Sequence, residues 1–466
     1  MARSDIIEYH DNQNYPGHGK AVTGVVIVLG AFFAAGIYSL MMLWASYGTQ
    51  VMNLINDILD VVSLVVSPTD AAIAISAILI GVVLLSFFVA FGASYLAKRL
   101  GGTLIYIGAF FMNLMTLAIP IVFLIIGGPF AWPVLIPGLF TLFITLLLFT
   151  VFRNRIKRAG EIVKLTGQVC LDEKGVFVPP LLVMIFTLVS AVMFGGIAFY
   201  SIDVLSGGNA LLVLSGAQDL TIENGWVAAV GIVLYLFATI FFYNFAYGTS
   251  SGMVYLYMRG RDPNLGDGVR SSLGVITGII ALSIMSVIIV IVRLILQRLG
   301  REVGGVGGAA VGRAAGGIIG WIWALLNYFT IPAMVAEELG AKDGIKRSAG
   351  LVKNNFVDVI IKETAVRWAF GVLAFIFFLA FALGGAVVGY VAFAGDLIAT
   401  LVLAVVFAVL AGIPVSLVLR TFDIVYVTLL YVFIRRKEGD VTGKTAIPSA
   451  LSRELDSAYS RAQSSG

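Results

Sequence analysis

Cysteine and histidine are almost absent from this chain of 466 residues. Cys170 is the single cysteine, and the two histidines, His10 and His18, both lie near the start of the chain. One thiol cannot form an internal disulfide framework or a cysteine-cluster metal site. Two histidines outside the apolar segments exclude histidine-based metal sites and haem held between membrane helices. The sequence therefore predicts no metal site and no cofactor.

Charged residues are also scarce. They make up 12% of the chain, about half of the ~25% that is usual in soluble domains. Hydrophobic residues account for 60%, and the mean hydropathy is +1.01. Several apolar segments reach the roughly 20 residues that a helix needs to cross a bilayer. The composition excludes a soluble domain and predicts an all-α fold, a polytopic bundle of membrane helices.

Motifs for catalysis are lacking as well. A G-x-S-x-G match at 248–252 lies in a predicted helix, and no histidine follows His18 to act as its base. The glycine run at 305–310 follows a membrane span, without the βαβ unit of a dinucleotide site. There is no P-loop and no pair of catalytic carboxylates. We therefore expect that the protein is not an enzyme.

Ten apolar segments are expected to span the membrane. They lie at about 21–47, 71–96, 103–126, 130–152, 178–204, 226–249, 273–296, 318–335, 364–393 and 397–418. The predicted organisation is a polar leader at 1–20, a four-span region at 21–152, a six-span region at 153–437 and a polar tail at 438–466. Polar residues recur at helical spacing within 51–66, and 16 residues rise only about 24 Å. This segment is predicted to lie on the outer membrane surface.

The net charge is +4, which we attribute to the bias of Lys and Arg toward cytoplasmic loops and not to a nucleic-acid site. Bases gather in alternate loops and in the tail. By the positive-inside rule, both termini are expected in the cytoplasm of a protein of the cell (plasma) membrane. One loop departs from the pattern, because Arg293, Arg298, Arg301 and Arg313 flank the glycine run on the expected outer side.

A basic segment recurs three times. Ile-Lys-Arg opens and Val-Lys closes both 156–164 and 345–353, and Gly268–Leu273 is similar to Gly344–Ala349. Each copy precedes two spans, which predicts a repeated unit of an amphipathic cytoplasmic surface helix and a helical hairpin. Its bases are predicted to bind anionic lipid head groups or a protein partner; they are Lys157, Arg158, Arg270, Lys346 and Arg347. Near such lipids each base is worth about 1 kcal/mol.

Two helices are too long for a bilayer. Residues 226–258 rise about 50 Å and residues 397–434 about 57 Å. They either break, at Gly248 and Pro414, or project into the cytoplasm. We favour projection, because a break that returned the chain outward would place the bases at 435–437 on the wrong side.

Few ionisable residues lie within or beside the spans. Arg420 and Asp423, and Glu363 and Arg367, are spaced so that each pair can meet on one helix face. We interpret both as structural pairs at the inner membrane interface. The remaining features that could line a polar path are Asn244, Asn327, Pro332 and Glu337. Asparagine joins helices through hydrogen bonds, and proline frees a backbone carbonyl.

Several loops of the second half of the chain contain residues that match the pattern of a known protein family. They contain Asn244, the Arg-Gly-Arg-Asp-Pro run at 259–263, Asp267-Gly268, and the stretch 321–348 with Pro332, Glu337 or Glu338, Gly340 and Lys346-Arg347-Ser348. Over roughly 155–437 the chain resembles an uncharacterised family of prokaryotic multi-pass membrane proteins, a domain of unknown function. The resemblance implies a membrane fold and a prokaryotic origin, and it carries no activity or site.

Two functions remain. The repeat, the Gly and Pro interruptions and the polar residues within spans are typical of a channel or transporter for an ion, small solute or lipid. The poverty of buried charge and the basic surface favour a non-catalytic scaffold or an accessory subunit, with a second copy or other membrane proteins as partners. The sequence narrowly favours a channel or transporter.

Overall fold

The computed structural model describes residues 19–63, 68–126, 131–208, 225–259, 261–393 and 395–437. Within these ranges the chain is helical, with no strand, which confirms the predicted fold class. The elements are α2 (Gly19–Ser63), α3 (Pro68–Ile125), α4 (Ala131–Val151), α5 (Arg153–Asp172), η1 (Lys174–Phe177), α6 (Val178–Leu205), α8 (Gly225–Tyr257), α9 (Leu265–Gly274), α10 (Ile276–Leu326), α11 (Thr330–Glu337), α12 (Ala341–Asn354), α13 (Phe356–Ala392) and α14 (Leu397–Lys437).

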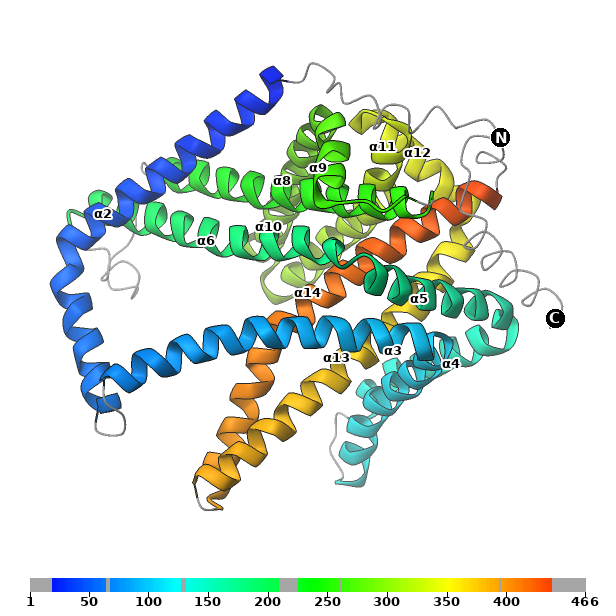
Figure 1. The fold of residues 1–466 in the computed structure, drawn as a ribbon, viewed down its shortest axis with the longest axis horizontal. Helices are drawn as coiled ribbons and strands as arrows, with labels where there is room; N and C mark the ends of the chain where they lie inside the picture. Colours follow the sequence, from blue (N-terminus) through cyan, green and yellow to red (C-terminus); the bar gives the residue numbers. More distant parts are fainter. Residues whose placement is uncertain are drawn as a thin grey trace.

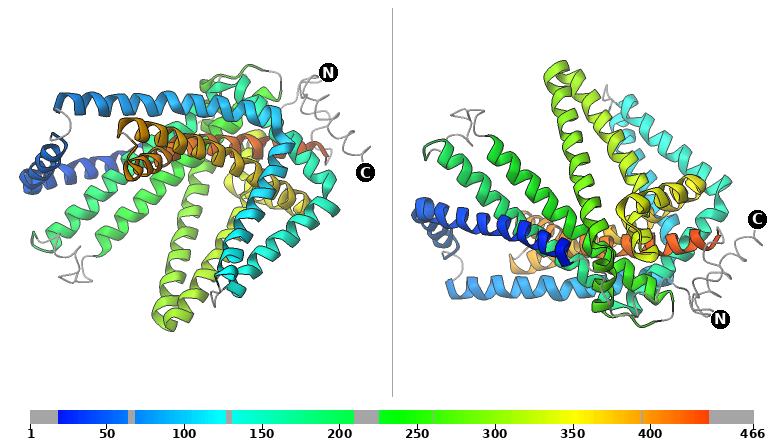
Figure 2. Two further views of the ribbon diagram at one scale, coloured as in Figure 1. Left: turned by 90° about the horizontal axis from the view of Figure 1, so that it is seen from below. Right: turned by 90° about the horizontal axis from the view of Figure 1, so that it is seen from above.

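The long helices other than α2 meet at one end of the molecule and diverge at the other (Figures 1 and 2). At the shared end lie the short helices α9, α11 and α12 together with α5 and the C-terminal part of α14. We call this region the hub: α5, α9, α11 and α12, with the ends of α8, α13 and α14 that contact them. The diverging ends carry the exposed apolar side chains that a lipid environment requires.

The described residues contain eight helices that are long and apolar enough to cross a membrane, or nine if one bent pair counts as a span. The protein is therefore a multi-pass membrane protein. The expected number was ten. Two of the expected spans lie in α3, which is continuous except for a sharp turn at Gly101 (φ 14°, ψ −86°). A further one, α4, joins α5 through a bend of 91° and forms the bent pair.

Residues 51–63, expected as a separate surface helix, continue α2 without a break. Most of their side chains and residues 64–67 lie outside the described part of the chain. The position of 51–66 on a membrane surface therefore stays a prediction, as do the structures of the leader and the tail.

α10 folds back on itself as two antiparallel arms. A Cβ on Gly300 would lie 2.4 Å from the carbonyl oxygen of Gly308, and one on Gly312 would lie 2.6 Å from that of Leu296. These residues are too far apart to touch along a straight helix, which rises about 1.5 Å per residue. Glycine permits this approach because it has no side chain, as in membrane helix pairs packed on small residues.

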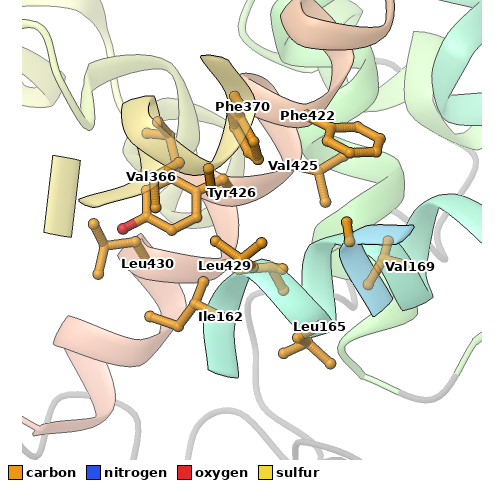
Figure 3. Packing of buried hydrophobic residues seen from close by; sticks show 14 of the residues in the cluster. Ile162, Leu165, Val169, Val366, Phe370, Phe422, Val425, Tyr426, Leu429 and Leu430 are labelled. Atoms are coloured by element: carbon orange, nitrogen blue, oxygen red, sulfur yellow. The ribbon is translucent and has the colours of Figure 1, made fainter. Parts of the chain in front are cut away.

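The two long helices do not break. α8 is continuous through Gly248, and α14 is continuous through Pro414. Every residue of α14 from Ile424 to Arg435 is buried, whereas many residues of its N-terminal half are exposed. A helix that is buried on all sides forms the axis of a core. Figure 3 shows Tyr426 and Leu429 of this axis between α5 and α13.

Two of the three basic helices dock through small residues at equivalent positions. Gly268 and Ser272 of α9 match Gly344 and Ser348 of α12 in the repeat, and all four are buried. The Ser272 hydroxyl donates to the Phe245 carbonyl (3.0 Å), and the Ser348 hydroxyl accepts from the Phe329 amide (2.9 Å). The G-x-S-x-G match on α8 is part of this docking, since a Cβ on Gly252 would lie 2.6 Å from that of Ser271.

The junction between α5 and η1 gives a prediction for pH dependence. Glu173 is buried there, and its burial, together with the nearby carboxylates of Asp262 and Asp172, raises its pKa to about 7. A raised carboxyl pKa stabilises the folded state below the unfolded value of about 4.5, and this contribution is lost as the pH rises through about 7.

We therefore expect the melting temperature to fall as the pH is raised from about 5 to about 8, and Glu173→Gln to flatten that slope. Thermal unfolding of the purified protein at a series of pH values measures both. Glu161→Gln is the matched control, because this carboxylate lies on the adjoining helix α5, is partly exposed, and is paired with Lys164 at 3.0 Å. A slope that is equal in wild type and Glu173→Gln would contradict the assignment.

Candidate functional site

A polar pocket of about 370 Å³ lies between five helices next to the hub. Its walls come from α8, both arms of α10, α11, α13 and α14. It is lined by Ile240, Tyr243, Asn244, Tyr247, Leu282, Ser286, Trp323, Ala324, Asn327, Tyr328, Ile331, Glu363, Arg367, Asp423 and Val427. Residues from across the second half of the chain therefore meet at one place, which we call the polar pocket.

A larger cavity, of about 640 Å³, lies between α2, α8 and α10. Its lining is apolar except for the hydroxyl of Thr277. Such an apolar groove has few groups that could recognise a specific ligand. The polar pocket is the better candidate site, because a binding site combines apolar walls with a few convergent polar groups.

Glu363 is held by two partners in the polar pocket. Arg367 donates through Nε to its Oε1 (2.7 Å), and the Tyr328 hydroxyl donates to its Oε2. Glu363 and Arg367 thus form the pair that their spacing predicts. The Glu363 side chain is 21% exposed and that of Arg367 is 79% exposed, so the pocket is open on the side of Arg367.

Asp423 faces the same pocket from α14 and is exposed there. The expected pair with Arg420 does not form: no ion pair joins the two residues, and Arg420 does not line the pocket. The charged groups that act on Asp423 are instead Glu363 and Arg367, across the interface with α13. Asp423 therefore belongs to the polar pocket and not to a local pair on α14.

Two amide side chains complete the polar lining. Asn244 is buried and donates through Nδ2 to the Ser283 hydroxyl (3.0 Å), which ties α8 to the first arm of α10. Asn327 donates through Nδ2 to the Trp323 carbonyl (3.0 Å). The Oδ1 atom of Asn327 is buried without a hydrogen-bond partner.

Asn327 lies at a break in a candidate span. α10 ends at Leu326 and α11 begins at Thr330, although the segment Ala310–Glu337 is apolar enough to cross a membrane as one unit. Pro332 is the third residue of α11, where a missing N–H costs nothing because the first turn of a helix has no acceptors for its N–H groups. Broken membrane helices commonly line binding sites in transporters.

Pro332 and Glu337 do not line the polar pocket, although they were expected on one path with Asn244 and Asn327. Pro332 is buried in the hub. Glu337 accepts from Arg347 Nε (3.0 Å) and from the Tyr431 hydroxyl, and Arg435 Nε is 3.5 Å away. These contacts join α11, α12 and α14 inside the hub, so Glu337 has a structural place there.

The five bases predicted to bind lipid or a partner are not equivalent. Lys346 is exposed and lies 3.9 Å from Asp343. Arg347 is engaged by Glu337, and Lys157, Arg158 and Arg270 are partly buried and have partners within the chain. Their role in binding anionic lipid or a protein stays a prediction, with Lys346 the most accessible of the five.

In the part of the chain that the structure describes, no group of three His, Cys, Asp or Glu side chains could hold a metal ion. The polar pocket itself contains two carboxylates, and one of them is already bonded to Arg367. Besides these carboxylates, the lining presents amide, hydroxyl and aromatic groups.

Every wall of the polar pocket and the whole Glu337 cluster lie between residues 225 and 441. That segment matches the model of a family of unknown function, DUF6159. The predicted resemblance to such a family is confirmed, over a shorter range that begins at 225 and not at 155. α2 to α6 lie outside the matched segment. No curated protein matches the chain.

The aromatic lining of the polar pocket was not predicted. Tyr243, Tyr247 and Tyr328 lie among many apolar residues in their spans, and aromatic residues make up 12% of the chain. The sequence signal for them was position: Tyr243 and Tyr247 lie within one helical turn of Asn244, and Tyr328 follows Asn327.

Proposed function

We propose that the protein is a channel- or transporter-type membrane protein that binds a small polar solute in the polar pocket. The observation that supports this most is the convergence of ionisable and amide side chains from α8, α10, α13 and α14 at a break in a membrane helix. Ionisable residues that face the interior of a membrane bundle are expensive and generally functional.

We further propose that the hub faces the cytoplasm of the cell, with the pocket at the inner edge of the membrane. Asp423 follows Leu397 by 26 residues, about 39 Å along α14, which exceeds the ~30 Å of the hydrocarbon core. α13 begins at Phe356 in the hub, and Glu363 lies seven residues after it, about 10 Å along the helix. A solute would reach such a site from the cytoplasmic side.

One observation favours the alternative of a non-catalytic scaffold or accessory subunit. In the most apolar stretch of each candidate span, only 17–39% of residues are buried within the chain. Because the long helices diverge away from the hub, other membrane helices, from a second copy or from a partner, could pack between them. Such an assembly is compatible with transport, so the flux experiment has to decide between the two.

The proposal predicts loss of flux when the pocket is blocked. We expect liposomes containing the protein to exchange at least one of Na⁺, K⁺, acetate, glycine or butylammonium faster than liposomes without protein. In Asn327→Leu the amide side chain, whose oxygen is unpaired, is replaced by an apolar side chain of similar size. This substitution should reduce the flux at least tenfold. Asn354→Leu, on the exposed end of α12, should leave it unchanged.

Absence of flux for the whole panel, together with recovery of a membrane partner at fixed stoichiometry, would replace transport by the scaffold function. Equal flux in Asn327→Leu and wild type would show that solute passes elsewhere.

A further inference from the structure

The charges of the polar pocket do not balance. Its lining contains two carboxylates, Glu363 and Asp423, and one guanidinium, Arg367. Arg367 is bonded to Glu363, and Asp423 has no hydrogen bond or ion pair with any described residue. When Asp423 is ionised, the lining carries one net negative charge, and an unpaired charge beside an apolar bundle is costly. A monovalent cation would balance it.

Part of the hydrogen-bonding capacity of the pocket is already used. The Tyr328 hydroxyl donates to Glu363, and the amide nitrogens of Asn244 and Asn327 donate to Ser283 and to the Trp323 carbonyl. The charged acceptor that remains in the lining is the Asp423 carboxylate, beside the hydroxyls of Tyr243, Tyr247 and Ser286. An ammonium group fits this set, because it donates to a carboxylate and to hydroxyl oxygens.

Aromatic rings form much of the remaining wall. Tyr243, Tyr247 and Trp323 line the pocket, and the ring centroids of the two tyrosines lie 6.1 Å apart. Asp423 is close enough to Tyr243, Tyr247 and Tyr328 to act on all three electrostatically. Aromatic faces attract cations and also pack against short hydrocarbon chains.

From this geometry we infer that the polar pocket binds a small organic cation with a primary ammonium group. The ammonium group donates to Asp423, and its hydrocarbon part packs against Tyr243, Tyr247 and Trp323. A pocket of about 370 Å³ is at the small end of the range for ligand sites. This inference deepens the proposed function and depends on the same pocket, but it concerns binding and can be tested without flux.

Two other ligand classes fit less well. An anion would have to compete with Glu363 for Arg367, and it would face the unpaired carboxylate of Asp423. A bare metal ion would find one free carboxylate and amide oxygens, fewer oxygen ligands than the six to eight that Ca²⁺ takes. The aromatic faces would not attract an anion, and a bare metal ion would leave unused the surface on which a hydrocarbon chain can pack.

The experiment compares three ligands that each have four carbons but differ in charge: butylammonium, 1-butanol and butyrate. The purified protein in lipid nanodiscs is titrated with each, and binding is followed by tryptophan fluorescence and by calorimetry. Trp323 lies in the pocket wall, so Trp323→Phe identifies its part of the fluorescence signal. We expect saturable binding of butylammonium only, and a rise in melting temperature with that ligand alone.

Asp423→Asn should weaken butylammonium binding at least tenfold, because it removes the unpaired charge. Asp423→Glu keeps the charge and should bind within about threefold of wild type, which separates loss of recognition from failure to fold. Asp343→Asn is the matched control, since it makes the same change on the exposed face of α12, and its affinity should equal that of wild type.

Preference for butyrate, equal affinity for 1-butanol, or unchanged affinity in Asp423→Asn would each overturn the inference. The two proposals can fail separately. Butylammonium binding without flux of any solute would support the ligand class and reject transport, whereas flux of a neutral or anionic solute without butylammonium binding would support transport and reject the ligand class.

Discussion

Replacing Glu337 with glutamine is expected to cause the largest loss of stability of any single polar substitution in the hub. Its carboxylate is shared by Arg347, Tyr431 and Arg435, from two different helices. The Arg435 side chain is 6% exposed, so it cannot recover its interaction in water. Removing one partner of a buried pair costs about 3–5 kcal/mol. Because Arg347 is 26% exposed, we expect a value near 3 kcal/mol.

The matched control is the neighbouring residue. Glu338→Gln makes the same chemical change one position later, at the left-handed end of α11 (φ 56°). Burial raises the pKa of Glu338 to about 7, so its charged form is disfavoured in the folded state. Above about pH 7 the Glu338→Gln protein should therefore be as stable as wild type or more stable, and below about pH 4 the two should be equal.

Thermal and denaturant unfolding of the purified variants in one detergent or lipid measures these differences. If Glu337→Gln and Glu338→Gln unfold together at pH 8, the Glu337 cluster contributes no net stability. In that case the contacts of α11 with α12 and α14 depend on packing and on the hydrogen bond from Phe329 to Ser348.

The second large effect is expected at Gly268, where α9 docks on α8. A Cβ there would lie 2.6 Å from the Thr249 carbonyl oxygen and 2.7 Å from Cγ of Met253. The carbonyl belongs to a helix backbone and cannot move aside. Overpacking of this kind costs about 1–3 kcal/mol, and we expect Gly268→Ala to lie in the upper half of that range.

The repeat supplies both a comparison and a control. At the equivalent position of α12, a Cβ on Gly344 would lie 2.6 Å from Cγ of Met334, a flexible side chain, so Gly344→Ala should cost less. Gly350 of α12 has nothing within 4 Å. Gly350→Ala should stabilise the protein by about 0.4–1 kcal/mol, because alanine lowers the entropy of the unfolded chain. If Gly268→Ala and Gly350→Ala changed the free energy of unfolding in the same direction, that result would contradict this docking geometry.

Composition and hydropathy predicted the fold class, and local spacing predicted the contacts that lie within one helix. Glu363 and Arg367, four residues apart, are paired. Arg420 and Asp423 have comparable spacing but do not pair, because α13 brings Glu363 and Arg367 to Asp423 from more than 50 residues away. Spacing along a helix shows which contacts are possible, and tertiary packing decides which of them form.

The same limit applies to the candidate path. Asn244, Asn327, Pro332 and Glu337 have similar sequence signals, as polar or helix-bending residues in or next to apolar helices. Only the first two line the polar pocket. Glu337 meets Tyr431, 94 residues later, and uniformly apolar helices carry no periodicity that would indicate which face or which end is buried. For the same reason, the buried half of α14 could not be distinguished from its exposed half.

The burial of Cys170 has a practical consequence. The chain has one cysteine, and its thiol is 2% exposed on the inner face of α5. A water-soluble reagent that modifies exposed thiols should leave the unaltered protein almost unlabelled, because reaction requires access to the sulfur. Cysteines introduced one at a time along α8, α10, α13 and α14 would then report on a nearly silent background. Water-soluble and lipid-soluble reagents would map which positions meet water and which meet the bilayer.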